Sequence, residues 1–232
     1  MSELILFHGS DHEIERPDFN LGKPTNDYGR GFYCTQDIDL AREWATKTGQ
    51  EGYVNRYRVD TDDLRLLDLL DGKHNILNWM ALLLKNRTFH LNSPIAEDAK
   101  RYIIQNFDVD LTGIDVIKGY RADDSYFSYA EDFVTNALSL NQLSRALYLG
   151  QLGTQIVLVS KKAFERITYL GSERVNENVY YFRYTIRDFQ ARNEYKECVR
   201  TRPDYADDIF VMDILRKEIK NGDPRLQCLV SK

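Results

Sequence analysis

Three side chains near the start of the chain have the chemistry to bind a flat, polar ligand. His8 follows a short apolar run and precedes Gly9 and Ser10, Tyr33 follows a glycine-rich loop, and Trp44 comes eleven residues later. A neutral imidazole can hydrogen-bond a ribose hydroxyl, and a serine hydroxyl can hold an amide or carboxamide. Aromatic rings stack on planar heterocycles. These residues predict a slot for a planar heterocycle, if the fold brings them to one place.

Each of these residues also has a purely structural interpretation. His8 can cap the end of a strand, Gly9 can allow a turn rather than the close approach of a ligand, and Trp44 can anchor its helix in the core. Gln155 stands at the start of a strongly apolar strand, where its side chain can meet a ligand or solvent. A single short motif is weak evidence for a site, so both interpretations stay open on these residues alone.

Acidic residues that could assist the chemistry lie in and after a turn-like segment. They are Asp123, Asp124 and Glu131. Acidic residues in turns are usually only solvated. His12, His74 and His90 show no metal-ligand spacing with a cysteine or with a pair of carboxylates, so no metal site is predicted.

The elements that must position these residues are predicted from hydrophobic periodicity and from turn-forming residues. Strands are expected over residues 4–7, 32–35, 53–59, 115–119 and 154–160. Helices are expected over 37–45, twice within 64–107 (the second opening at Ser93-Pro94), after 160, and over 207–220. Residues 133–149 are expected to form either one helix or two helices with a break at Leu140-Asn141. Residues 11–31 are predicted to form an ordered but irregular loop, and the mixed pattern of 180–195 favours neither a helix nor a strand.

Length and composition place the chain among ordinary globular proteins. It has 232 residues, of which 43% are hydrophobic and 29% are charged, and this is enough to bury a substantial core. The order of the expected elements predicts an α+β fold in one domain over residues 1–232, with the helical block after residue 64 as an insertion.

Charge and cysteine usage narrow the class of partner and compartment. The formal net charge of −5 disfavours bulk DNA binding, which usually needs a basic excess, although a local basic groove stays compatible. Three widely spaced cysteines fit a reducing compartment rather than a disulfide framework. The apolar runs are too short for a signal-peptide core or a membrane span. A cytoplasmic protein without a membrane partner is therefore predicted.

Taken in order, the motifs resemble the ADP-ribosyltransferase superfamily, in its diphtheria-toxin and poly(ADP-ribose) polymerase branch. That branch places His on its first strand in a His-Gly-Ser/Thr setting, continues with a Gly-x-Gly-aromatic-Tyr strand and a helix with a second ring, and opens a later strand with Glu. The matching residues are Phe7-His8-Gly9-Ser10, Gly29-Arg30-Gly31-Phe32-Tyr33, Trp44 and Gln155-Ile156-Val157-Leu158-Val159.

The chain looks more closely like a bacterial branch called domain of unknown function 3990 (DUF3990). The likeness includes Arg16-Pro17-Asp18 and the segments 27–33, 41–45, 116–124 and 155–164. It covers residues 4–168 and implies an ADP-ribosyltransferase-like split antiparallel β-sandwich. Residues 169–232 lie outside the likeness and are expected to pack on this domain as a C-terminal extension.

The resemblance also implies a substrate, NAD, and a role for each matched residue. The nicotinamide would lie between Tyr33 and Trp44, with its carboxamide on the Gly9 backbone and Ser10 close by. His8 would hold a ribose hydroxyl on the adenosine side, and Ala41 on the Trp44 helix completes the NAD-binding set. The catalytic residues would be His8, Tyr33 and Gln155, with no metal.

Gln155 departs from the superfamily pattern, which has Glu at this position. A glutamine keeps a hydrogen-bond acceptor for the ribose hydroxyl but loses the negative charge, and charge-assisted hydrogen bonds are roughly twice as strong as neutral ones. Glutamine also cannot act as a general base. The departure therefore argues against elongation of poly(ADP-ribose) and leaves mono-ADP-ribosylation, helped by a reactive acceptor or by one of the auxiliary carboxylates.

Two functions of different class follow from the resemblance. The first is a cytoplasmic mono-ADP-ribosyltransferase that modifies a protein or nucleic-acid target, with a bacterial toxin and its cognate antitoxin as one setting. The alternative is a catalytically inactive module that binds NAD or ADP-ribose. An RNA 2′-phosphotransferase of related fold is a third reading, but the additional His and Arg positions of that family are not evident in this sequence.

Overall fold

The computed structural model describes residues 3–122, 124–149, 153–200 and 208–229. The chain forms two compact units. The sheet unit comprises Met1–Asp68, Leu111–Tyr120 and Leu152–Asp188. The helical unit comprises Leu69–Asp110, Arg121–Gln151 and Phe189–Lys232. The expectation of a single domain over 1–232 stays a prediction.

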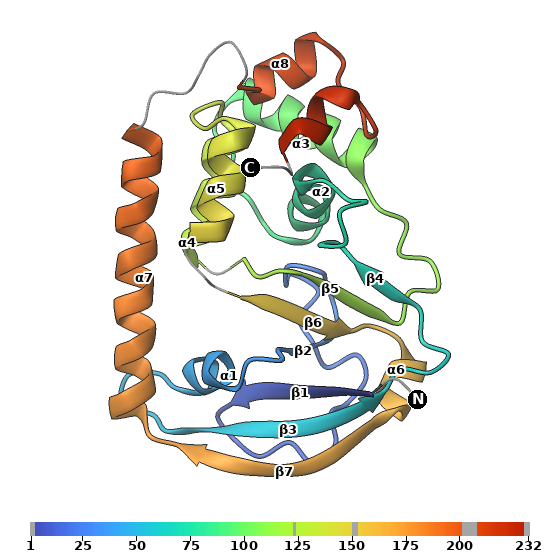
Figure 1. Cartoon of the computed structure of the whole chain (residues 1–232), viewed down its shortest axis with the longest axis vertical. Helices are drawn as coiled ribbons and strands as arrows, with labels where there is room; N and C mark the ends of the chain where they lie inside the picture. The colour runs from blue at the N-terminus through green and yellow to red at the C-terminus, as the bar shows by residue number, and fades with distance from the viewer. Residues whose placement is uncertain (1–2, 123, 150–152, 201–207, 230–232) are drawn as a thin grey trace. The chain divides into compact units, whose positions relative to one another are not determined.

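The first sheet of the sheet unit has three antiparallel strands in the order β1-β3-β7 (Figure 1). They are β1 (Glu3–Ser10), β3 (Gly52–Asp60) and β7 (Ile167–Val175). The central strand β3 pairs His8 with Asn55 on one side and carries a register shift between Arg56 and Tyr57 on the other. β7 follows the expected strand at 154–160 but was itself not predicted.

The second sheet has the order β2-β6-β5-β4. Its strands are β2 (Phe32–Cys34), β6 (Thr154–Leu158), β5 (Val116–Tyr120) and β4 (Leu66–Asp68). The β2–β6 and β5–β6 pairs are antiparallel, but β4 and β5 are parallel, which differs from the expected antiparallel arrangement. Parallel neighbours need a long crossover connection, and the chain between these two strands contains two helices.

One pair of residues joins the two sheets. Phe7 on β1 and Thr35, directly after β2, exchange both backbone hydrogen bonds, at 2.7 and 2.9 Å. In the described part of the chain no second bridge between β1 and β2 is found, so the two strands separate beyond this pair. The separation of β1 from β2 is called the split below.

The core of the sheet unit has two parts. The larger part packs between the sheets and contains Leu6, Phe32, Cys34, Tyr57, Val59, Val116, Ile156, Leu158 and Ala163. The smaller part packs α1 (Ile38–Ala45) on the first sheet and contains Ala41, Ala45, Val54 and Val175. The short helix α6 (Lys161–Glu165) supplies Ala163 to the larger core. Successive strand side chains therefore alternate between the core and the opposite face of each sheet.

The helical unit contains the block that was expected as an insertion. Its helices are α2 (Ile76–Asn86), α3 (Pro94–Phe107), α4 (Asp124–Val134), α5 (Leu140–Leu149), α8 (Val211–Arg216) and the 3₁₀ helix η1 (Pro224–Leu229). The expected start of α3 is confirmed, because the Ser93 hydroxyl accepts a bond from Ala96 N at 3.2 Å and Pro94 is the first helical residue. The helix α2 is buried on nearly every face.

Two helical regions differ from the sequence prediction. The helix expected from residue 133 begins earlier, at Asp124, and a connection over 135–139 separates it from α5. The unsettled region 180–195 lies within α7 (Glu177–Arg200), which begins in the sheet unit and ends in the helical unit. Its aromatic residues recur on all sides of the helix, so it lacks the one-sided periodicity that identifies an amphipathic helix. None of the described helices could cross a membrane, since none is long and apolar enough.

Candidate functional site

His8 spans the split between the two sheets. It lies two residues after the core residue Leu6 on β1, on the same face, and its ring packs on Phe32 with a centroid distance of 4.5 Å. The imidazole Nδ1 lies 2.6 Å from the backbone carbonyl oxygen of Tyr33 on β2. The side chain of one strand therefore replaces a backbone bond where the strands separate.

The surroundings of His8 keep its imidazole neutral. Burial lowers the pKa of His8 below its usual value of 6.5, and the bond to the Tyr33 carbonyl opposes this only in part. Because a carbonyl can only accept, Nδ1 carries the proton and Nε2 presents a lone pair. Among the described residues no hydrogen bond reaches Nε2. This nitrogen can accept a hydrogen bond from a ligand hydroxyl.

Gly9 presents backbone groups at the open edge of β1. The polar groups of Phe7 point toward Thr35 and away from β3, and in an antiparallel pair the residue two positions on points the same way. The N–H and C=O of Gly9 therefore point into the split. One donor and one acceptor, side by side on a strand, match the acceptor and donor of a carboxamide.

The missing side chain of Gly9 has a separate cause. A Cβ atom at this position would lie 2.1 Å from the Ala41 carbonyl oxygen, 2.6 Å from Ala45 N and 2.9 Å from Trp44 Cβ. Helix α1 thus occupies the side from which a side chain would project. Glycine is needed here for the packing of α1, and this packing brings Ala41 and Trp44 to the edge of β1.

Ser10, the last residue of β1, is bonded to the loop that follows the strand. Its hydroxyl donates to the His12 carbonyl at 2.6 Å and accepts from Asn55 Nδ2 at 2.8 Å. Asn55 is fully buried on β3, and its Oδ1 accepts from Ile14 N at 2.8 Å. One asparagine therefore fixes the path of the chain from His8 to Ile14.

Tyr33 is fixed by the loop that precedes it. Its hydroxyl donates to the Gly29 carbonyl at 2.7 Å and accepts from Tyr28 N at 3.0 Å. Gly29 has a φ of 76°, and its N–H bonds to the Asn26 carbonyl at 2.9 Å, which closes a turn. The predicted ordered loop is confirmed in this part, and it fixes the orientation of the phenol ring.

Gln155 shares a sheet face with Tyr33. Ile156 and Leu158 of β6 point into the larger core, so Gln155 points to the opposite face, and Tyr33 is paired with Val157 on that face. The side chain of Gln155 is 4% exposed, and its Nε2 donates to Asp27 Oδ2 at 2.8 Å and to the Tyr120 carbonyl at 3.2 Å.

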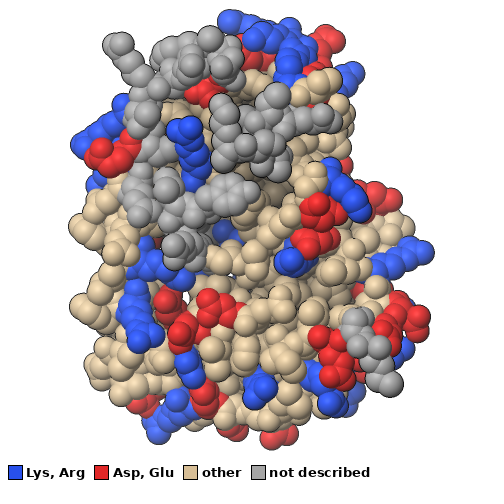
Figure 2. Space-filling view, viewed as in Figure 1, with Lys and Arg blue, Asp and Glu red and all other residues tan. Residues whose placement is uncertain are grey.

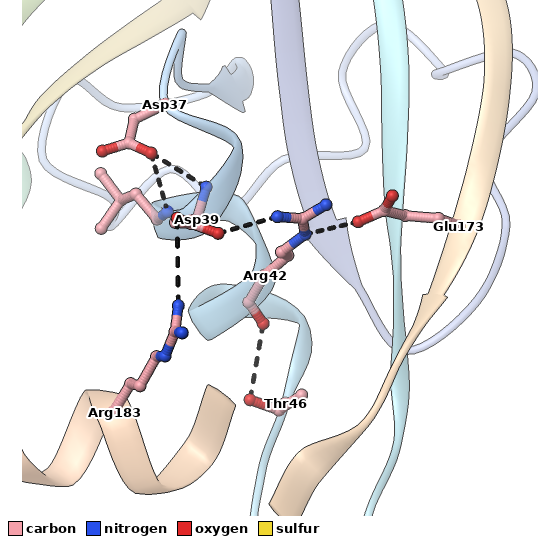
Figure 3. A network of polar contacts seen from close by, with 7 residues as sticks. Asp37, Asp39, Arg42, Thr46, Glu173 and Arg183 are labelled. Atoms are coloured by element: carbon pink, nitrogen blue, oxygen red, sulfur yellow. Dashed lines mark hydrogen bonds and ion pairs between the residues drawn. The ribbon is translucent and has the colours of Figure 1, made fainter. Parts of the chain in front are cut away.

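Helix α1, which carries Trp44, is capped as predicted. Asp37 accepts from Asp39 N at 2.9 Å and from Leu40 N at 3.2 Å (Figure 3). Arg42 on the same helix donates to Asp39 at 2.8 Å and to Glu173 on β7 at 2.5 Å. The bond to Glu173 is the main reason why the pKa of Arg42 is raised. The helix is thus tied to the far edge of the first sheet.

A second set of charges ties α1 to α7. Arg183 approaches Asp39 at 3.9 Å, where both side chains are more than half exposed (Figure 3). Arg187 forms an ion pair with Glu43, and these side chains are only 19% and 10% exposed. Glu43 immediately precedes Trp44, so this ion pair is well placed to set the position of the tryptophan.

The structure brings several of the predicted site residues together within the sheet unit. His8, Gly9, Tyr33 and Gln155 lie on adjacent strands around the split, and Ala41 and Trp44 lie on the helix against Gly9. Asp123 lies outside the described residues, and Asp124 and Glu131 belong to α4 in the helical unit.

Two residues of this region were missed by sequence reasoning. Asp27 was counted only as a turn former, yet it is 6% exposed and bonded to Gln155. Asn55 was placed on one face of an alternating strand without a role. Asn55 lies between Tyr53 and Tyr57 on the same face of its strand. A buried polar group must find hydrogen-bond partners, so this position could have indicated a structural role for Asn55.

Charges on the surface are mixed. Figure 2 shows acidic and basic side chains interspersed over the described part of the face that it draws, in keeping with a net charge of −5. Among the described residues, no group of three or more His, Cys, Asp or Glu side chains is arranged to hold a metal ion.

Comparison with protein families identifies the chain. The model of a protein family of unknown function, DUF3990, matches residues 4–169, which is more than half of the chain. The chain belongs to the DUF3990 family. This confirms the closer of the two resemblances stated above.

The DUF3990 match covers the complete candidate site. It includes β1, β2, α1 and β6 with His8, Tyr33 and Gln155, and it ends within β7, before α7. Arg187, which pairs with the DUF3990 residue Glu43, therefore lies beyond the matched segment. Comparisons with curated proteins and with solved structures returned no match.

Proposed function

We propose that this DUF3990 chain is an NAD-dependent mono-ADP-ribosyltransferase. The observation that carries the proposal is the arrangement at the split. His8 bonds to the Tyr33 carbonyl across the gap, while the Gly9 N–H and C=O point into it. These groups offer a hydroxyl acceptor, a carboxamide partner and an aromatic ring within one short stretch of two strands.

Each group has a complementary part of NAD. The nicotinamide carboxamide pairs its N–H and C=O with those of Gly9, and the nicotinamide ring stacks on Tyr33, with Trp44 on the adjacent helix. The lone pair on His8 Nε2 accepts from a ribose hydroxyl of the adenosine half. Because His8 is neutral and its ring packs on Phe32, the acceptor is already oriented when NAD binds.

The chemical step needs few groups from the protein. The bond between C1′ of the ribose and the nicotinamide nitrogen breaks, and its electron pair goes to that nitrogen, which neutralises the pyridinium charge. The resulting oxocarbenium ion is captured by an oxygen or nitrogen atom of the acceptor, which loses its proton to water. Catalysis of such a step comes from positioning and from negative charge near the developing cation.

Gln155 supports mono-ADP-ribosylation rather than chain elongation. Its amide oxygen can accept from the 2′-hydroxyl of the nicotinamide ribose, but an amide cannot remove a proton from an incoming ribose hydroxyl. The acceptor is therefore a protein or nucleic-acid group that is a good nucleophile by itself. A cytoplasmic toxin with a cognate antitoxin is the biological setting that we propose for this activity.

A second candidate function is a module that binds NAD or ADP-ribose without catalysis. The neutral character and deep burial of Gln155 favour it, since only an amide stands where the superfamily has a carboxylate. In this case the same groups around the split would hold NAD, and the glycosidic bond would stay intact.

Labelled NAD separates the two candidates. The purified protein is incubated with NAD labelled in its adenylate part and with cell lysate, and both transferred label and released nicotinamide are measured. His8→Ala and Tyr33→Ala test the site, and His12→Ala is the matched control. The His12 side chain is exposed and bonds to its neighbour Asp11, and the substitution keeps the His12 carbonyl to which Ser10 and Asn55 donate. The enzyme is supported by label transfer that both site variants abolish and that the control retains.

Binding of NAD without cleavage would overturn the proposed enzyme. If NAD quenches the fluorescence of Trp44 while no label is transferred and no nicotinamide is released, the proposed enzyme is overturned in favour of the binding module. Expression in a bacterial host adds an independent check. Growth arrest that Tyr33→Ala relieves and His12→Ala does not supports the toxin, whereas arrest that persists in the Tyr33 variant contradicts a role for NAD in toxicity.

A further inference from the structure

The Gln155 amide is oriented by two acceptors. Its Nε2 donates one bond to the Asp27 carboxylate and one to the Tyr120 carbonyl. An amide nitrogen has two hydrogen atoms, and both are used. The reversed amide would place its oxygen against two other oxygens, so the side chain has one favourable orientation. Oε1 is then the only group of the amide left for a ligand.

The loop that carries Asp27 is itself fixed in the sheet unit. Tyr28, the next residue, donates its hydroxyl to the same Tyr120 carbonyl at 2.7 Å and is 4% exposed. Its backbone N–H bonds to the Tyr33 hydroxyl. Asp27 is therefore held against Gln155 by neighbours on both β5 and β2, and its carboxylate is 6% exposed.

We propose that Asp27 is a positioning residue that supplies, through the Gln155 amide, the negative charge that the glutamine lacks. A carboxylate that accepts from an amide N–H polarises the amide and makes its oxygen a stronger acceptor. Asp27 and Gln155 together then act as a relayed carboxylate: Oε1 accepts from the ribose hydroxyl, and the Asp27 charge stabilises the developing oxocarbenium ion. The inference rests on the proposed NAD cleavage.

The alternative is that Asp27 only anchors its loop. The two roles differ in what a charge-neutral substitution does. Asp27→Asn keeps the size of the side chain and an oxygen that can accept from Gln155, but it removes the charge. An anchoring role predicts little change in catalysis, whereas the relay predicts a loss in kcat with the affinity for NAD retained.

The test moves the negative charge from position 27 to position 155. Nicotinamide release gives kcat, and quenching of Trp44 fluorescence gives the dissociation constant for NAD. Asp27→Asn keeps a hydrogen-bond acceptor for Gln155 but removes its charge. We expect kcat to fall about 10- to 100-fold, the range that hydrogen bonds to charged groups contribute, with the affinity for NAD changed by less than about threefold. The double variant Asp27→Asn with Gln155→Glu places a carboxylate directly at the site and should restore most of the lost kcat. Tyr28→Phe, which removes a hydroxyl from the same loop, should change kcat by less than about twofold.

Each outcome decides between the two roles. An unchanged kcat in Asp27→Asn overturns the relay while leaving the proposed function intact. A loss that Glu at position 155 does not restore, matched by an equal loss in Tyr28→Phe, assigns Asp27 to loop anchoring and also overturns the relay. If the unsubstituted protein binds NAD and releases no nicotinamide, the proposed function fails, and the catalytic role of Asp27 fails with it.

Discussion

The Nδ1 atom of His8 lies 2.6 Å from the carbonyl oxygen of Tyr33, across the point where β1 leaves β2. One residue earlier on β1, Phe7 and Thr35 still exchange two backbone bonds. The imidazole thus takes over from the backbone at the first position where the strands have separated. The same residue that holds the two sheets together at the split would present its second ring nitrogen to NAD in the function that we propose.

The stability of the protein should depend on pH through His8. Its folded pKa is lowered below 6.5, so between the folded pKa and 6.5 the unfolded chain binds more protons than the folded chain. The free energy of unfolding therefore falls as the pH drops through this window, by up to about 1.4 kcal/mol per pH unit for one group. Urea unfolding at pH 7.5 and 5.5 measures the change, and His8→Asn should show a smaller one.

NMR of the imidazole gives an independent check of the same prediction. His8 should stay neutral, with its proton on Nδ1, at pH values just below 6.5, where an imidazole of ordinary pKa is mostly protonated. An imidazole of His8 that titrates at or above pH 6.5 would contradict the burial that the structure describes.

Gly9→Ala should destabilise the protein by about 2–3 kcal/mol, because the added Cβ would lie 2.1 Å from the Ala41 carbonyl oxygen and would force α1 off the strand. Gly49→Ala is the matched control: its φ is 72° and no atom lies within 4 Å of the added Cβ. That substitution should cost only about 1 kcal/mol, from backbone strain. Thermal unfolding measures both, and equal costs would exclude helix packing as the reason for Gly9.

Asn55→Ala should cost about 2–3 kcal/mol of unfolding free energy. The substitution leaves the Ile14 N–H without its acceptor and removes the donor to Ser10 in a buried place. Ser10→Ala removes one bond of the same network and should cost about 1 kcal/mol. Chemical unfolding gives the two values. If the Asn55 variant is no less stable than the Ser10 variant, the asparagine does not organise the loop.

The ion pair between Arg187 and Glu43 should be strongly coupled. Replacing either residue alone leaves a mostly buried charge, with an expected cost of about 2–3 kcal/mol. The double variant Arg187→Met with Glu43→Leu should restore much of the lost free energy of unfolding. A double-mutant cycle measures the coupling between the two residues. Arg183→Ala removes the exposed approach to Asp39 and should cost less than about 1 kcal/mol. Additive costs in the cycle would show that the pair contributes nothing by itself.

Tyr33→Phe should separate the contribution of the Tyr33 ring from the contribution of its hydroxyl. The ring stays available for stacking, while the bonds to the Gly29 carbonyl and the Tyr28 N–H are lost, at a cost of about 1–2 kcal/mol in stability. On the proposed function, NAD should bind a few-fold more weakly in Tyr33→Phe and far more weakly in Tyr33→Ala. Calorimetric titration with NAD distinguishes the variants, and equal affinities in all three proteins would remove Tyr33 from the binding site.

Local features of the fold could be predicted because their causes are local. The strand that ends at His8–Ser10, the cap at Asp37 and the start of α3 at Ser93-Pro94 depend on residues within a few positions of one another. The edge strand β7 and the helix α7 could not be predicted in the same way. Half of β7 is exposed, and α7 has no single apolar face, so neither has the periodicity on which such predictions depend.

The sequence by itself determined the order of the motifs, the α+β class and the family. It presented His8, Tyr33, Trp44 and Gln155 as an ordered set that resembles the ADP-ribosyltransferases, with Gln155 as the departure from that pattern. Only the tertiary structure decided what each of them meets. Asp27 and Gln155 are 128 positions apart in the chain, and their hydrogen bond exists because the loop before β2 folds back over the sheet, where Tyr28 bonds to the Tyr120 carbonyl and Tyr33 bonds to the Gly29 carbonyl. Strand register is set by packing over the whole sheet, so contacts of this kind cannot be read from local pattern.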